Sequence, residues 1–439
     1  MSADAKTYTF HLRKGVQFAN LPPVSGRALT AADVVWSFDY WSRTGQFKDA
    51  KLQPSFLAPR FEGVEKIEAP DPSTVVVRFK DPFVPFLTYA ALDWLPVVPH
   101  EIYNLDGHLK NRIAGTGPFQ LDVAASQKGS RWSWKKNPTY WDEGKPYLDE
   151  VRWLVIPDDS TMKAAFVAKQ LSWIPIPDAK SADEVQRAVP DAVAHEFEAV
   201  VGGCTYLNQK APPFNILEVR KAFSLAIDRD EISQVFYGKK QPVAAAGALA
   251  GLFTDAEARQ LSRYDPGEAK RLLAQAGFAN GVDIEWQERS SAPNKENELV
   301  QAQAKKAGIN ISLKMLDLAE QTQNRKVGNY QMQFVGANCG NLTDEHDALY
   351  LIYHSKSAIN LSGTNDPDLD KLLVAQRQET NAEKRREIQR QAVKVIADKA
   401  YTISWVYPPK WEFWPRALKG HAPNSQVPYP GFGNAWLDK

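Results

Sequence analysis

Apolar and polar residues alternate at period two in short segments near the amino terminus. Residues 8–13 follow this pattern, as a half-buried strand does, and residues 74–79 form a second run rich in valine. Between them, Thr30 stands three residues before Asp33, which is typical of a capping box, and apolar residues recur on one face of the helix that follows. The pattern predicts strands packed against a capped amphipathic helix.

The next part of the chain is rich in strands that carry aromatic residues. Ser160 is expected to cap a short helix that ends near Ala168, and Ser181 with Glu184 forms a second possible capping box. The Pro-Pro pair at 212–213 marks a plausible lobe boundary. The predicted strands cover residues 119–123, 131–135, 151–156, 193–197 and 199–207.

Beyond residue 213, predicted helices and strands alternate. Two of the helices end in Ala-Gly, and Gly277 and Gly308 have the place of a left-handed residue after a helix. Such alternation is typical of α/β or α+β layers. The predicted helices cover residues 217–226, 267–276, 294–307, 367–380 and 382–399, and the predicted strands cover 282–287, 309–316, 331–335 and 401–406.

Composition and charge narrow the class of protein. A chain of 439 residues has the length of about three domains. Lys and Arg number 53 against 52 Asp and Glu, and this balance argues against a nucleic-acid-binding protein. A hydrophobic share of 44% is enough for sizeable cores. The 13 tryptophans are unusual, and they can serve either as core or as binding surface.

No cofactor or metal site is expected. The two cysteines are too few for a four-ligand zinc site, and the nearest histidines, His346 and His354, are eight residues apart. We interpret these two as solvated histidines. The basic run at 384–386 is flanked by Glu383 and Glu387, a pattern that predicts a solvated helix face.

One catalytic motif can be considered. Ser160 and Lys163 match the S-x-x-K of penicillin-binding serine acylases, and residues 206–208 could stand as a second element. The third element, K-T-G or K-S-G, is missing, since Lys326-Val327-Gly328 has no hydroxyl. A serine acylase therefore stays only as an alternative to a non-enzymatic protein.

The order of several short segments resembles a known family. No single segment is decisive, but their succession from Tyr8 to about Trp405 is similar to the family 5 extracellular solute-binding proteins, which are the peptide, opine and nickel receptors of ABC importers. The matching segments are residues 8–18, 29–37, 115–119, 137–141, 212–215, 219–223, 226–229, 265–266, 269–273, 276–278 and 370–373.

The resemblance implies a two-lobed α/β fold of the class II periplasmic-binding-protein type. A ligand would bind in the cleft between the lobes, and closure would produce the shape that the importer recognises. The domains then expected are an extra subdomain of the first lobe at 1–114, the main sheet of that lobe at 115–210, the second lobe at 211–405, and a return to the first lobe at 406–439. The chain would cross between lobes near 207–212 and 406–409.

The family pattern also implies where the protein works. Members carry an export signal and further residues before the strand that matches residues 8–12, so the resemblance implies that the amino-terminal part is missing here. The expected location is the periplasm or the cell surface. The expected partners are a small ligand and the permease subunits, with no nucleic acid and no membrane span, and the protein is expected to be a monomer.

The resemblance suggests ligand-facing residues near the crossings and on one cleft loop. Peptide receptors of the family place an acid on that loop, whereas residues 336–341 offer amides and backbone, with Asp344 the nearest acid. Without an acid on this loop, a peptide amine would lose a direct ion pair, which argues against ordinary peptide specificity. A polar neutral ligand such as an oligosaccharide is compatible with the amides. The candidate contacts are Tyr206, Asn208, Asn338, Asn341, Asp344, Trp405 and Tyr407.

Two further implications stay open. Some family members have a disulfide at about the places of Cys204 and Cys339, so a bridge is expected, with two small buried thiols as the alternative. The expected function is capture of a small polar ligand, such as a peptide, an oligosaccharide or a related solute, for an ABC transporter. A module that senses ligand for a membrane signalling partner would have the same sequence features.

Overall fold

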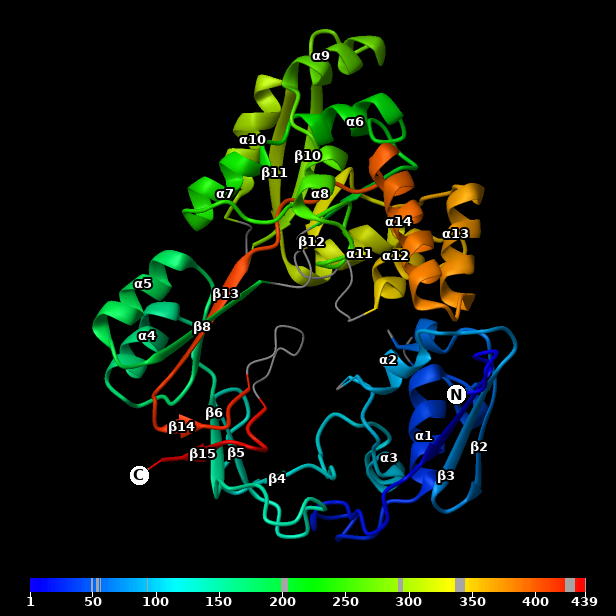
Figure 1. The fold of residues 1–439 in the computed structure, drawn as a ribbon, viewed down its shortest axis with the longest axis vertical. Coiled ribbons are helices and arrows are strands. Elements are labelled where there is room, and N and C mark those ends of the chain that lie inside the picture. The colour runs from blue at the N-terminus through cyan, green and yellow to red at the C-terminus, as the bar shows by residue number, and fades with distance from the viewer. Residues whose placement is uncertain are drawn as a thin grey trace. The chain divides into compact units, whose positions relative to one another are not determined.

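The protein folds into two compact units in the computed structural model (Figure 1). The first unit comprises Met1–Glu196 and Trp411–Lys439, and the second unit comprises Phe197–Lys410. No helix in the described part of the chain is long and apolar enough to span a membrane. The structure describes residues 1–48, 50–52, 55, 57–92, 94–198, 204–290, 295–335, 344–422 and 431–438.

The first unit begins with a small antiparallel sheet in the strand order β1-β3-β2. Tyr8 of β1 and Val75 and Val77 of β3 are buried, and Phe38 of helix α1 is also buried. The predicted strands at 8–13 and 74–79 and the capped helix are confirmed. The elements are β1 (Thr7–His11), α1 (Ala31–Ser42), two 3-10 turns (Gly45–Phe47 and Ala58–Phe61), β2 (Val64–Asp71), β3 (Thr74–Phe79), α2 (Phe86–Ala90) and α3 (His100–Asp106).

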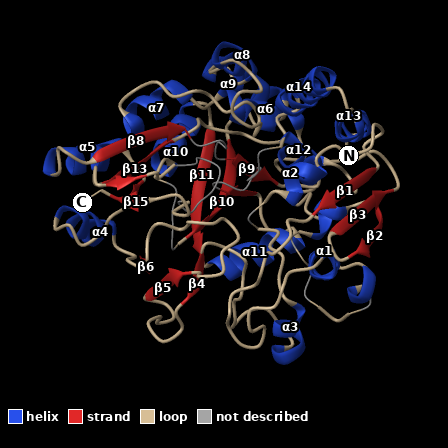
Figure 2. Cartoon of the chain, turned by 60° about the horizontal axis from the view of Figure 1, so that its bottom comes forward, coloured by secondary structure: helices blue, strands red, loops and turns tan. Residues whose placement is uncertain are grey.

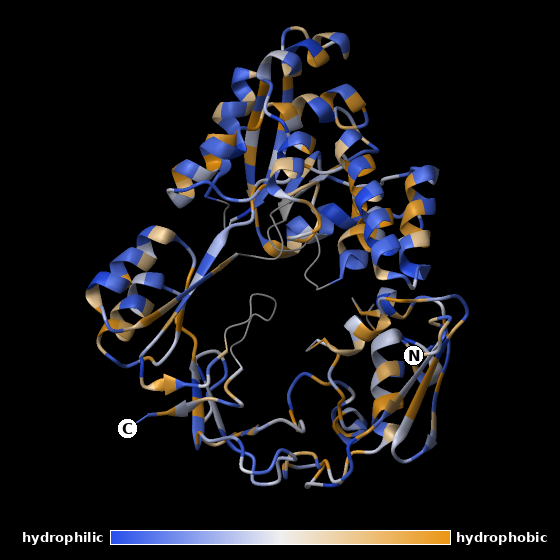
Figure 3. Cartoon of the chain, viewed as in Figure 1, coloured by the Kyte–Doolittle hydropathy of each residue, from blue (hydrophilic) through white to orange (hydrophobic). Residues whose placement is uncertain are grey.

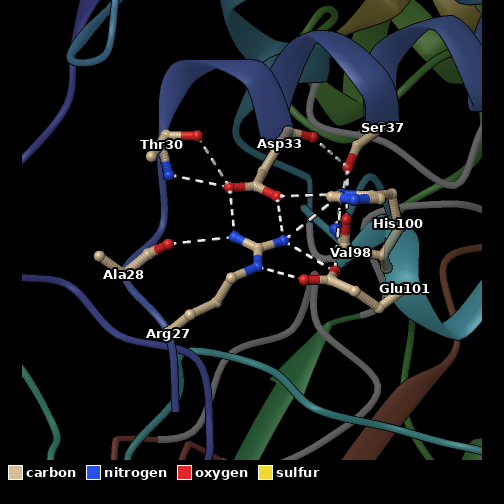
Figure 4. Close-up of polar contacts among 8 residues, drawn as sticks. All are labelled: Arg27, Ala28, Thr30, Asp33, Ser37, Val98, His100 and Glu101. Atoms are coloured by element: carbon tan, nitrogen blue, oxygen red, sulfur yellow. Dashed lines mark hydrogen bonds and ion pairs between the residues drawn. The ribbon is translucent and has the colours of Figure 1, made fainter. Parts of the chain in front are cut away.

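One arginine joins three segments of this region. The Arg27 guanidinium donates to both carboxylate oxygens of Asp33, at 2.9 and 2.6 Å, and to both oxygens of Glu101 (Figure 4). Asp33 in turn accepts from the Thr30 backbone N–H at 2.9 Å, as the predicted capping box requires. Arg27 thus fastens the loop before α1 to the starts of α1 and α3, and we call these three side chains the Arg27 cluster.

The rest of the first unit contains two more three-stranded sheets, in the orders β4-β5-β6 and β7-β13-β8, and a two-stranded β14-β15 pair. Phe413 of β13 packs with Ile174 and Ile176 of β7 and with Phe166 of α4. The elements are β4 (Phe119–Leu121), β5 (Arg131–Lys136), β6 (Glu150–Leu154), α4 (Asp159–Val167), β7 (Ile174–Ile176), α5 (Ala179–Ala188), β8 (Val193–Glu198), β13 (Pro409–Trp414), β14 (Leu418–Lys419) and β15 (Trp436–Leu437).

The caps predicted for α4 and α5 are wrong. Asp158 caps α4 by accepting from the Thr161 backbone N–H, and Asp178 caps α5 by accepting from the Ser181 N–H. Aspartate and serine are both favoured as N-caps. In both helices the aspartate that precedes the serine takes this role, so each helix starts earlier than predicted. Ser160 therefore lies inside the first turn of α4.

The second unit is built on one four-stranded sheet in the order β11-β10-β12-β9 (Figure 2). β10 pairs in parallel with β11 and β12, and β9 pairs antiparallel with β12. Helices cover the sheet, and Figure 3 shows hydrophilic and hydrophobic positions alternating along them. Trp286 of β10 lies fully buried in a large apolar core. The strands are β9 (Cys204–Leu207), β10 (Val282–Arg289), β11 (Ile309–Leu316) and β12 (Met332–Val335).

Most sequence-based predictions for the second unit are confirmed. Gly277 and Gly308 have φ values of +88° and +89°, the left-handed conformation expected after α9 and α10. The helices are α6 (Leu217–Leu225), α7 (Arg229–Tyr237), α8 (Asp255–Leu261), α9 (Pro266–Gln275), α10 (Asn297–Lys306), α11 (Leu318–Val327), α12 (Glu345–Tyr353), α13 (Pro367–Gln378) and α14 (Ala382–Asp398).

The strand predicted at 401–406 is wrong. In its place, Thr205 of β9 contacts Ile403 through both its backbone and its hydroxyl, which accepts from the Ile403 N–H at 3.0 Å. A side chain thus replaces one backbone partner of a strand ladder, and the segment forms isolated bridges, such as that between Val243 and Val406, in place of a continuous strand. The strand begins later, at Pro409.

Candidate functional site

The strands of the second unit's sheet share one edge. Because β10, β11 and β12 are parallel, their carboxyl ends meet at the same side of the sheet. Val335, the last residue of β12, pairs with Cys204, the first residue of β9. We call this side, marked by Arg289, Leu316, Val335 and Cys204, the carboxyl edge. In open α/β sheets ligands bind outside the carboxyl ends of the strands, so this edge is the candidate site.

The segment 402–407 lies against the start of β9 and carries two of the predicted contacts. Trp405 and Tyr407 are both buried. The Trp405 carbonyl accepts from the Ala244 N–H at 3.2 Å, and the Tyr407 hydroxyl donates to the Ala248 carbonyl at 2.7 Å. Both aromatic residues are therefore held against the alanine-rich segment 241–252. A role in ligand contact stays a prediction for each.

Tyr206 and Asn208 occupy different positions along β9. Tyr206 is buried, and the guanidinium of Arg325 from α11 lies 5.1 Å from the centre of its ring. Asn208 follows Leu207, which pairs with the first residue of β12, so it lies at the other end of the strand from the carboxyl edge. Its amide donates to the Gly328 and Tyr330 carbonyls at 3.0 and 2.8 Å. Asn208 thus holds the turn before β12, and its ligand role stays a prediction.

Asp344 is engaged by an arginine. Its carboxylate pairs with both terminal nitrogens of Arg385 from α14, at 2.9 and 2.6 Å, and also accepts from the His346 N–H to cap α12. Asp344 is buried, so the pair is well shielded from water. Such bidentate pairs are among the strong hydrogen bonds of proteins. The geometry favours a positioning role over a direct contact with a ligand amine.

The next residue, Glu345, is the most unusual acid in the unit. It is 8% exposed, and its carboxyl group accepts from the Leu249 backbone N–H at 3.0 and 3.2 Å. Burial raises the pKa of Glu345 to about 8, although the Leu249 hydrogen bond acts in the opposite direction. Glu345 therefore carries its proton over most of the neutral range.

Three predicted residues of this region, Asn338, Cys339 and Asn341, lie outside the described residues. Cys204 begins β9, but its side chain is also outside the described part. The disulfide between Cys204 and Cys339 and the ligand role of the two asparagines stay predictions.

The basic run of α14 is exposed for the most part, as predicted, since Lys384, Arg386 and the flanking glutamates are exposed and only Arg385 among these five residues is partly buried. Arg385 pairs with Asp344, Arg386 donates to the Gly251 and Leu252 carbonyls, and Arg390 pairs with Glu257. Asp344 is the N-cap of α12, Glu257 lies on α8, and Gly251 and Leu252 precede α8. The arginines of α14 thus connect this helix to the start of α12 and to α8.

The interpretation of His346 and His354 as solvated is also wrong. Both are buried, and the Tyr350 ring stacks between them with centroid distances of 4.8 and 4.3 Å. The His346 Nδ1 lies 2.7 Å from the Gln376 side-chain nitrogen. Within the described ranges, no group of three or more potential metal ligands is found.

Sequence analysis did not single out Arg289. It is the last residue of β10, an inner strand of the sheet, so it lies at the carboxyl edge, and it is half-buried. Below it, the buried side chains of Gln287 and Gln333 hydrogen-bond to each other at 2.9 Å, and Asn324 of α11 donates to Gln287. Only the strand order shows that this arginine stands at a candidate site.

The serine acylase motif has no support in the structure. The Lys163 ammonium donates to Glu184 of α5 at 2.8 Å, and this hydrogen bond raises the pKa of Lys163. A lysine that acts as a general base must lose its proton near neutral pH, so the pairing opposes that role.

Comparisons with known proteins agree with one another. The family model described as "Bacterial extracellular solute-binding proteins, family 5 Middle" matches residues 1–360. The chain is similar to the dipeptide-binding protein of Escherichia coli (strain K12), at 28% identity over 96% of this chain and 82% of that protein. It is also similar to heme-binding protein A of Haemophilus influenzae, at 26% identity over 91% of this chain and 76% of that protein.

Solved structures show the same fold. The periplasmic binding protein DppA from Helicobacter pylori, in complex with the peptide STSA, aligns with a TM-score of 0.84 at 22% identity, over 100% of this chain and 88% of that chain. The protein AgaA from A. tumefacien R10, in complex with agropinic acid, aligns with a TM-score of 0.83 at 25% identity, over 100% and 88%. The two-lobed periplasmic-binding-protein fold predicted from the sequence is confirmed.

Proposed function

Because the chain belongs to the bacterial extracellular solute-binding proteins of family 5, we propose that it captures a short peptide or a peptide-like acid and delivers it to the permease of an ABC importer. The match to the family model over residues 1–360 carries this proposal. Members of the family are transport receptors, and we extend this non-enzymatic role to the present chain. We further propose that it works as a monomer in the periplasm or at the cell surface.

A ligand with a carboxylate fits the relatives and the carboxyl edge. The relatives include dipeptide-binding and glutathione-binding proteins, and the similar structures hold a peptide and agropinic acid. These ligands share a carboxylate. The Arg289 guanidinium at the end of β10 has the planar pair of donors that suits such a group. Arg289 is therefore our first candidate for ligand contact.

The other end of the ligand would meet amides rather than an acid. Arg385 already engages Asp344, which leaves Asn338 and Asn341 as the polar candidates on the cleft loop. Amides recognise amide and hydroxyl groups as well as they recognise an amine. This arrangement favours a modified amino acid or a peptide whose amine is not held by an ion pair.

Binding can be measured by calorimetry with the full chain and a panel of dipeptides, glutathione, agropinic acid and neutral oligosaccharides. We expect the acidic ligands to bind and the oligosaccharides not to bind. Arg289→Ala should weaken binding by about tenfold or more, because a charge-assisted bidentate contact is lost. Lys314→Ala on the neighbouring β11 is the matched control and should bind like the unaltered protein.

Two results would contradict the proposal. If only the oligosaccharides bind, the ligand class is wrong, and if Arg289→Ala binds the acids unchanged, the carboxylate site is elsewhere. Nitrocefin provides a test of the enzymatic alternative, since hydrolysis that disappears in Ser160→Ala would indicate an acylase. A sensory role differs only in its partner, so absence of permease and ATPase genes nearby would favour it.

A further inference from the structure

The segment 241–252 joins the start of α12 to the segment that carries Trp405 and Tyr407. The Leu249 N–H donates to the Glu345 carboxyl group, which belongs to the first turn of α12. The Ala248 carbonyl accepts from the Tyr407 hydroxyl at 2.7 Å. These two contacts fall on adjacent residues of the segment. A displacement of Leu249 would therefore also move the Ala248 carbonyl, which accepts the hydrogen bond of the Tyr407 hydroxyl.

Further hydrogen bonds from backbone N–H groups hold the segment 241–252 to the segment 402–407 and to α8. The Ala244 N–H donates to the Trp405 carbonyl at 3.2 Å, and the Tyr407 N–H donates to the Pro242 carbonyl at 2.9 Å. The Val243 N–H donates to the Asp255 carboxylate of α8 at 2.9 Å. The segment is buried along most of its length, so its groups cannot exchange these partners for water without opening.

We propose that Glu345 is a positioning residue for ligand binding, which holds Trp405 and Tyr407 in place through the segment 241–252. The proposal rests on the proposed function, since it assumes that the ligand binds at the carboxyl edge. Glu345 itself does not contact the ligand. Its carboxyl group acts through the Leu249 and Ala248 backbone, and its protonation state decides whether this contact is kept.

The charged groups around Glu345 come from two helices. On α12 the neighbouring Asp344 carboxylate raises the pKa of Glu345, and on α14 the guanidinium groups of Arg386 and Arg385 lower it. The segment 241–252 contains no charged side chain, and from segment 402–407 Tyr407 faces it. Burial outweighs the arginines, so the closed arrangement favours the protonated acid.

The direction of the pH effect follows from this preference. A solvated glutamate has a pKa of about 4.3, well below the value of about 8 in the closed arrangement. Between these two pKa values the closed arrangement keeps a proton that the opened arrangement loses, so the Leu249 contact opens more often as the pH rises from about 5 to 8, and this dependence levels off above 8. Ligand affinity should fall in the same pH range.

Amide hydrogen exchange of the ligand-free full chain tests the proposal directly. Between pH 5 and 9, after correction for the intrinsic exchange rate, protection of residues 241–252 should fall about tenfold or more as the pH rises to 8 and then level off. Glu345→Gln keeps an acceptor for Leu249 but cannot ionise, so its protection should stay constant. Glu345→Ala should be poorly protected at every pH. Glu383→Gln on α14 is the control, and it should behave like the unaltered protein.

The functional arm uses the dipeptide Met-Leu. Its affinity should fall as the pH rises from about 5 to 8 in the unaltered protein and stay constant in Glu345→Gln, and Tyr407→Phe should weaken it at all pH values. Constant protection of the unaltered protein, or an equal fall in Glu345→Gln, would overturn the proposal. If no acidic ligand binds the unaltered protein at pH 7, the proposed function fails, and the exchange experiment still decides the role of Glu345.

Discussion

Arg27 in the first unit and Arg229 in the second unit each hold several segments together, and the two guanidinium groups are stabilised in opposite ways. Arg27 in the first unit is surrounded by the carboxylates of Asp33 and Glu101. Arg229 in the second unit is buried, and within the described part of the chain its guanidinium donates to backbone carbonyls. These carbonyls belong to Ser224, Ile227, Ser262 and Ser404, at 3.3, 3.1, 2.9 and 2.8 Å.

The opposite surroundings give opposite pKa shifts. Hydrogen bonds from Arg27 to Glu101 and Asp33 raise the pKa of Arg27, whereas burial lowers the pKa of Arg229 to about 10. Both remain charged at neutral pH. The difference shows that a charge can be stabilised by opposite charges at a half-exposed place or by oriented dipoles inside a core, and only the first arrangement depends on titratable partners.

The largest effect is expected for Arg229→Met. The substitution leaves four carbonyls of the core without their donor, and we expect the free energy of unfolding to fall by about 3 kcal/mol or more. Urea denaturation followed by tryptophan fluorescence measures it. Because the hydrogen-bond partners of the guanidinium among the described residues are carbonyls, which do not titrate, the loss should be nearly equal at pH 4 and pH 7. Arg229→Lys keeps the charge and should lose less, and a loss below about 1 kcal/mol in Arg229→Met would contradict the comparison.

A smaller and pH-dependent effect is expected for Arg27→Met. At pH 7 we expect a loss of about 2 kcal/mol, since the buried Asp33 loses its main partner but keeps the Thr30 contacts. The Arg27 hydrogen bond lowers the pKa of Glu101, so this pair stabilises the fold above the ordinary glutamate pKa and the stabilisation is lost as the pH falls through the lowered value. The difference between variant and unaltered protein should therefore shrink in acid.

The same denaturation series at pH 3, 4 and 7 measures this dependence, with Arg78→Met on β3 as a control because Arg78 pairs only at an exposed site with Glu68. A loss for Arg27→Met that does not change with pH would mean that packing of its side chain, rather than the carboxylate pairs, holds these segments.

The elements of the second unit could be predicted because their signals are local. The period of the apolar residues and the glycines at 277 and 308 lie within the elements that they define. The failures share the opposite property. The strand expected at 401–406 depends on Thr205, about 200 residues away, and the buried His346 contacts Gln376 of another helix. The spacing of two histidines does not indicate such a partner.

The candidate site was predictable only in part. The resemblance drew attention to Trp405 and Tyr407 near a crossing, and their ligand role stays a prediction. The sequence around Arg289 does not indicate a binding site, because an arginine at the end of a strand can equally be an ordinary surface residue. Its position becomes meaningful once the strand order β11-β10-β12-β9 places β10 in the middle of the carboxyl edge.

The smallest effect on the free energy of unfolding is expected at the N-cap of α5. Here a negatively charged side chain, rather than an arginine, is stabilised by backbone groups. The Asp178 carboxylate accepts from the Ser181 N–H at 2.9 Å, so a negative group meets backbone donors as Arg229 meets backbone acceptors. Asp178→Ala should lower the free energy of unfolding by about 1 kcal/mol, as the loss of an N-cap does. Ser181→Ala, which removes only a hydroxyl that accepts from Lys163 at 3.3 Å, should change it by less than about 0.5 kcal/mol. If Ser181→Ala costs more than Asp178→Ala, the serine is the cap after all, and dipoles would stabilise the arginine of the core but not the acid at the helix end.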